Sequence, residues 1–79
     1  MAAVHLTDAD ISAVAGETNL PVDQVRRMAV GVTTIAGALQ GPLVLPRVRF
    51  WATLRCDTTI GRLRRAFWCL MARALSAGP

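Results

Sequence analysis

The sequence predicts an all-α fold, a small bundle of three or four helices in a single domain over residues 1–79. Apolar residues recur at intervals of three or four along most of the chain, which is the period of a helix with one buried face. Thr7, Pro21 and Gly41-Pro42 are helix start and stop signals that divide this pattern into segments. A chain of this size has a marginal core, yet 53% of its residues are hydrophobic, so we expect a homodimer or a larger partner.

Two helices joined by a tight turn are expected between residues 7 and 29. Thr7 is a natural N-cap, and Asp10 three residues later completes a capping box. Asn19 is the non-glycine residue type that most readily takes a left-handed conformation at a helix end. Pro21 has a backbone angle suited to the first turn of the next helix.

The second helix is expected to run to about Gln40. Its apolar positions keep helical spacing at Val22, Val25, Met28, Val32, Ile35 and Leu39. No residue from Met28 to Pro46 is charged, but Gln40 and the Gly41-Pro42 stop interrupt the run. This interruption favours a buried helix and a connector over a membrane span.

Residues 43–55 fit two interpretations. Pro46 suits the first turn of a third helix, but Val48 and Phe50 alternate with Arg47 and Arg49, as in a β ribbon. Of the two, we favour the helix. A last amphipathic helix is expected over about 58–75, with Asp57 or Thr58 as its cap. Its apolar face would hold Ile60, Leu63, Phe67, Leu70, Met71 and Ala74, opposite Arg62, Arg65 and Arg73.

A short pattern in the first two helices points to a family. The small residue Ala15 is followed four positions later by the turn residue Asn19, and then by the apolar residues Leu20 and Val25. Residues 7–29 thereby resemble the helix-turn-helix family of DNA-binding proteins. The resemblance implies a small transcriptional regulator of a bacterial or phage setting, whose second helix enters the major groove. The DNA contacts would be Gln24, Arg26 and Arg27, with Thr7 and Thr18 on phosphates and with Arg62 and Arg65 extending the basic footprint.

The alternative hypothesis is a protein that docks on a larger protein or nucleoprotein complex. The apolar excess and the aromatic residues flanked by arginine support it, because interface hot spots are enriched in Trp and Arg. In size and in its lack of enzyme motifs the chain is similar to phage- or plasmid-encoded inhibitors such as the anti-CRISPR proteins. The expected anchors are Trp51, Phe67 and Trp68, with Arg64 beside them. A third hypothesis places the last helix on an anionic membrane surface.

Charge and composition bound the remaining functions. The net charge is +4 and all nine basic residues are arginine, which permits nucleic acid, acidic protein or anionic lipid as partner. The sequence holds no catalytic constellation, so we expect neither an enzyme nor a cofactor. The lone His5 and the distant Cys56 and Cys69 do not have the spacing of a metal site. Without a secretory signal at the first residues, we expect a cytoplasmic protein with both thiols reduced.

Overall fold

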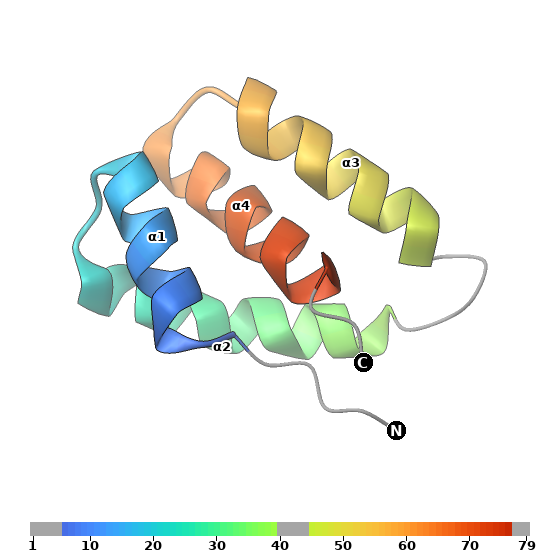
Figure 1. Ribbon diagram of the computed structural model, residues 1–79, viewed down its shortest axis with the longest axis horizontal. Helices are drawn as coiled ribbons and strands as arrows, with labels where there is room; N and C mark the ends of the chain where they lie inside the picture. The colour runs from blue at the N-terminus through green and yellow to red at the C-terminus, as the bar shows by residue number, and fades with distance from the viewer. Residues whose placement is uncertain (1–5, 40–44, 77–79) are drawn as a thin grey trace.

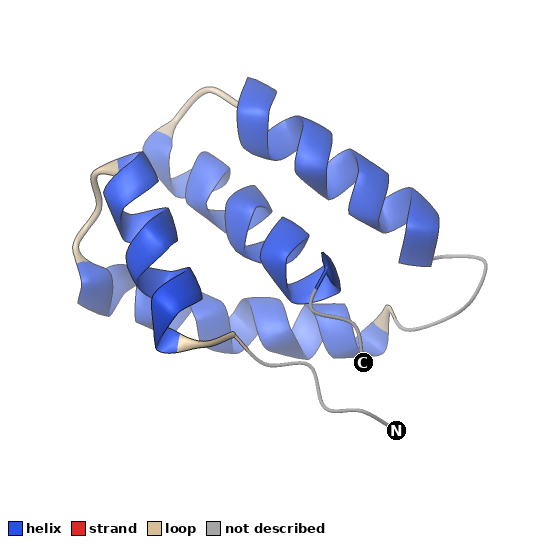
Figure 2. Ribbon diagram, in the orientation of Figure 1, coloured by secondary structure: helices blue, strands red, loops and turns tan. Residues whose placement is uncertain are grey.

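The structure is a computed structural model that describes residues 6–39 and 45–76. These residues form four α-helices and no strand (Figures 1 and 2). They are α1 (Asp8–Thr18), α2 (Val22–Ala38), α3 (Leu45–Thr58) and α4 (Arg62–Ser76). The all-α fold class is confirmed, and residues 45–55 are helical rather than a β ribbon. The expectations for His5, for Gln40, for the Gly41-Pro42 stop and for the start of the connector fall outside the described residues.

The start of α1 is capped as its sequence predicts. The hydroxyl of Thr7 accepts a hydrogen bond of 3.2 Å from the backbone N–H of Asp10. The carboxylate of Asp10 in turn accepts one of 3.1 Å from the backbone N–H of Thr7. This reciprocal capping box satisfies two amide groups that have no partner within a helix.

The turn between α1 and α2 also follows the prediction. Asn19 has φ 57° and ψ 43°, in the left-handed region, and ends α1. The N–H of Leu20 then donates to the carbonyl of Ala15 across 3.1 Å, as at many helix C-termini. After this turn α2 crosses α1 instead of running alongside it (Figure 1), and both Ala15 and Val25 lie in the shared core.

The central helix is α4. It contacts α1, α2 and α3, whereas α3 contacts α4 and no other described helix (Figure 1). The core therefore forms around α4, and neither α1 nor α2 covers the face of α3 that points away from α4. The buried hydrophobic side chains are Ile11, Val14, Ala15, Val25, Ala29, Val32, Ala36, Ala52, Ala66, Cys69, Leu70, Met71, Ala74 and Leu75.

The boundary between α3 and α4 differs from the prediction. The expected start of the last helix near Thr58 is wrong, because α3 continues through Thr58, whose hydroxyl donates to the carbonyl of Leu54 at 2.9 Å. Thr58 thus makes the bond of a residue inside a helix instead of an N-cap bond. The turn falls later, at Gly61, whose φ of 103° suits glycine. Ile60, expected on the apolar face, lies in this turn and is 91% exposed.

Candidate functional site

The predicted DNA-contacting residues of α2 are in different environments. The guanidinium of Arg26 is engaged by carboxylates, at 3.7 Å from Asp8 and 3.5 Å from Asp23. Arg27 is exposed and has no ion pair or hydrogen bond within the described parts of the chain. Gln24 is half-buried and lines a cleft next to Leu20. Arg27 is therefore the basic side chain of α2 that is available to a partner.

The predicted basic residues of α4 also separate into two kinds. Arg65 is half-buried; its Nε donates to the carbonyl of Cys56 at 3.2 Å, and a terminal nitrogen donates to the carbonyl of Glu17 at 3.5 Å. Its guanidinium thus ties α4 to the last turns of α3 and α1. Arg62 and Arg64 are exposed and line the cleft that Gln24 also borders. These two arginines are open to a partner, whereas Arg65 is occupied within the fold.

Charge is unevenly divided between the two halves of the bundle. Residues 6–39, which form α1 and α2, hold four carboxylates and two arginines, a net charge of −2. Residues 45–76, which form α3 and α4, hold seven arginines and one aspartate, a net charge of +6. An anionic partner is therefore attracted to the α3 and α4 side and repelled by the first two helices.

The four predicted partner-binding residues differ in exposure. Phe67 and Trp68 are half-buried against the core, with their rings edge to face at 5.1 Å. Arg64 is exposed at the start of α4. Trp51 is exposed on α3, and the guanidinium of Arg55 lies 6.0 Å from its ring and 5.2 Å from the ring of Trp68. Of the three expected aromatic anchors, only Trp51 is available as an exposed anchor.

Two neighbours of Trp51 on α3 were not among the predicted partner-binding residues. Phe50, Trp51 and Leu54 are 64%, 52% and 41% exposed and lie on one side of α3, opposite the buried Ala52. We call these three residues the α3 outer face. Arg47 lies one turn before them, exposed and without an ion pair or hydrogen bond among residues 6–39 and 45–76. The expected helix already places these residues at helical spacing, but spacing alone does not tell which face of that helix is left exposed.

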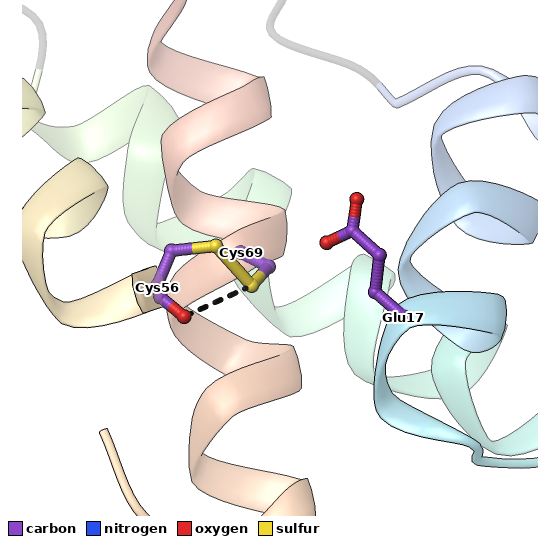
Figure 3. A group of neighbouring side chains, drawn as sticks. All are labelled: Glu17, Cys56 and Cys69. Carbon is purple, nitrogen blue, oxygen red and sulfur yellow. Dashed lines mark hydrogen bonds between the residues drawn. A yellow bond between two sulfur atoms is a disulfide. The ribbon is translucent and has the colours of Figure 1, made fainter. Parts of the chain in front are cut away.

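The two cysteines are joined, contrary to the expectation of free thiols. Cys56 in α3 and Cys69 in α4 form a disulfide, with their Cα atoms 4.6 Å apart (Figure 3). Cys69 is 2% exposed and belongs to the buried core. The helical hairpin of α3 and α4 brings together two residues that are 13 positions apart in sequence.

Glu17 of α1 lies beside this disulfide. One carboxylate oxygen and the two sulfur atoms are within 4.8 Å of one another (Figure 3). They border an open cleft of about 330 Å³ that Asp57 and Arg73 also line. Sequence reasoning missed Glu17, because no local spacing relates it to the cysteines.

Arg73 connects this cleft to the start of α1. Its guanidinium lies 3.1 Å from Asp10 and 3.7 Å from Glu17. Burial raises the pKa of Asp10, but hydrogen bonds from Thr7 and Arg73 and the charge of Arg73 outweigh it, so the pKa lies below its ordinary value of 3.8. Asp10 therefore stays ionised at neutral pH and keeps Arg73 in place.

Comparison with known sequences and structures identifies no relative of this chain. Among the described residues, none of the helices combines the length and the apolar character that crossing a bilayer requires. No protein-family model, curated protein or solved structure matches the chain.

Proposed function

We propose that this protein is a small binding module that docks on a larger protein through the α3 outer face. The observation that carries the proposal is the exposure of Phe50, Trp51 and Leu54 on a helix that, among the four described helices, contacts only α4. Leaving three large apolar side chains in water is unfavourable, and contiguous apolar patches often mark interaction sites. Their spacing is that of a helix laid along an apolar groove.

The charge around this face specifies the partner further. Arg47 and Arg55 flank the three apolar residues, within the half of the chain that carries a net charge of +6. A partner with an apolar groove and an acidic rim would complement both features. A phosphate backbone would satisfy the arginines but would leave Phe50 and Leu54 without apolar contacts. These features favour an acidic protein surface, as in the alternative of an inhibitor similar to the anti-CRISPR proteins.

Co-purification from the source cells tests this function. The tagged full chain should retain one protein in stoichiometric amount, with or without nuclease treatment. Trp51→Ala should weaken the affinity for that protein by about 30-fold or more, the loss of a hot-spot residue. Val30→Ala is the matched control, because Val30 is 68% exposed on α2 and should leave the affinity unchanged. Retention of nucleic acid alone, or wild-type affinity of Trp51→Ala, would contradict the proposal.

A second candidate function is a transcriptional regulator of the helix-turn-helix kind. The left-handed Asn19, the Leu20 to Ala15 hydrogen bond and the buried Val25 support it, because this turn and packing are what the resemblance requires. It stands second because α1 and α2 carry a net charge of −2, and because Arg26 is engaged by carboxylates.

A gel-shift series tests the regulator separately. If α2 enters the major groove, Arg27→Ala should weaken specific DNA binding by about 1–3 kcal/mol. Arg47→Ala is the control, since Arg47 is also exposed but lies on α3. Equal effects of the two substitutions would indicate non-specific attraction to phosphate instead of recognition by α2.

A further inference from the structure

The disulfide and Glu17 together contain the parts of a metal site. Reduction of the Cys56–Cys69 bond leaves two thiols beside a carboxylate, with one ligand atom from each residue within 4.8 Å of the others (Figure 3). The three residues come from α3, α4 and α1, so three helices converge on this point. Thiolate sulfur and carboxylate oxygen are both ligands of Zn²⁺.

We propose that the reduced protein binds a divalent cation of the zinc type through Cys56, Cys69 and Glu17. A water molecule from the adjoining cleft of about 330 Å³ takes the fourth position. The site exists only in the reduced protein, because a disulfide has no thiolate to offer. The proposal is independent of which macromolecule the α3 outer face binds.

Small movements complete the coordination sphere. A tetrahedral zinc ion with bonds of about 2.3 Å to sulfur and about 2.1 Å to oxygen needs ligand separations of about 3.5–3.8 Å. Once the covalent bond is broken, the sulfur atoms must move apart by less than about 2 Å. The Glu17 oxygen, now within 4.8 Å of the sulfurs, must approach by about 1 Å. Glu17 is exposed, so rotation of its side chain supplies this movement.

The surrounding charges suit the loaded site. Two thiolates, one carboxylate and a divalent cation leave a net charge of −1. The guanidinium of Arg73 lies 3.7 Å from Glu17, and that of Arg65 hydrogen-bonds the carbonyl of Cys56 at 3.2 Å. When Glu17 turns to the metal, Arg73 keeps its 3.1 Å ion pair with Asp10. Both guanidiniums therefore remain beside the site and stabilise its negative charge.

Reduction and metal binding replace the disulfide by two bonds between thiolate and metal. A thiol reductant of the glutathione type attacks the disulfide, and two equivalents yield the Cys56 and Cys69 thiols and one oxidised, disulfide-linked reductant. The incoming cation then displaces the two thiol protons to water. In the reverse exchange, the disulfide-linked form of the reductant oxidises the two thiolates: the Cys56–Cys69 bond forms again, the cation is released, and the reductant's own disulfide breaks to give two thiols that take up two protons from water. Redox state thus selects a covalent link or a metal link between α3 and α4.

Cobalt titration of the full chain tests the site, with Co²⁺ as a coloured substitute for Zn²⁺. The reduced protein should develop thiolate-to-cobalt charge-transfer bands that saturate at one ion per chain and disappear when Zn²⁺ is added. The oxidised protein and reduced Cys56→Ser should show no such bands. Absence of the bands in the reduced wild type, or saturation at one ion per two chains, would overturn the proposal.

If the cysteine variants fail to fold, Glu17→Gln tests the site instead, because this variant keeps both thiols. It should bind Co²⁺ at least about tenfold more weakly than the wild type, since it loses a charged ligand. Asp23→Asn removes an exposed carboxylate on α2 and should bind as the wild type does. Equal affinities of Glu17→Gln and the wild type would exclude Glu17 as a ligand and refute the three-residue site.

Discussion

Removal of the Cys56–Cys69 disulfide should cost this protein about 3 kcal/mol of stability. The bond closes a loop over a sequence separation of 13, and the chain-entropy relation gives about 3 kcal/mol for a loop of this length at 25 °C. For a chain of this size, that loss lowers the midpoint of thermal unfolding by about 12–24 °C. In a small domain with a marginal core, this is a large part of the total stability.

Removal of the disulfide should destabilise α3 more than the other helices. Apart from the disulfide, α3 is held to α4 by the buried Ala52, by half-buried neighbours and by two hydrogen bonds of 3.2 Å. In these bonds Arg49 Nε donates to the carbonyl of Leu75, and Arg65 Nε donates to the carbonyl of Cys56. No other described helix contacts α3. Amide hydrogen exchange in α3 should therefore rise more than exchange in α1 and α2 after reduction.

Urea unfolding with and without a reducing phosphine measures the effect, with a chelator present so that no metal replaces the bond. The double variant Cys56→Ser/Cys69→Ser should match the reduced wild type and should not respond to the phosphine. A loss below about 1 kcal/mol would refute the loop-entropy reasoning. Uniform loss of protection over all four helices would refute the conclusion that α3 is held separately.

Three further predictions concern stability. Leu70→Ala in α4 should cost about 2–5 kcal/mol in urea unfolding, because Leu70 is fully buried; a cost below about 1 kcal/mol would contradict this packing. The contribution of Asp10, whose pKa is lowered on folding, is fully present above pH 3.8 and is lost as the pH falls through the folded-state pKa. Asp10→Asn should therefore flatten this part of the acid limb of the stability curve, and an unchanged limb would argue against it. Arg65→Gln should lower the free energy of unfolding by about 1–3 kcal/mol, since it removes charge-assisted bonds to Cys56 and Glu17; unaltered unfolding would show that these bonds contribute little.

Local signals in the sequence predicted local structure well. Thr7 with Asp10 and the left-handed Asn19 each act through neighbours within five residues, and their conformations follow the expectations. The predicted start of the last helix near Thr58 also depended on a local signal, and it was wrong. Asp57 and Thr58 have the chemistry of an N-cap, but Thr58 donates within α3 to Leu54 instead.

Long-range relations could not be obtained from spacing. The arginines look alike in sequence, yet Arg65 and Arg26 are occupied by partners within the fold whereas Arg27 is not. Which arginine is free depends on which helix end or carboxylate lies opposite, and this follows from tertiary packing. The same is true of Cys56, Cys69 and Glu17, which only the meeting of three helices brings together.

The position of α4 has a consequence for how the chain is made. It follows the other three helices in sequence, yet each of them packs against it. During synthesis α1 and α2 can pack on each other, but the apolar surfaces of α1, α2 and α3 that contact α4 stay exposed until α4 has emerged from the ribosome. In that interval Cys56 has emerged without Cys69, so chaperones and small thiols reach the nascent chain before its own second cysteine does.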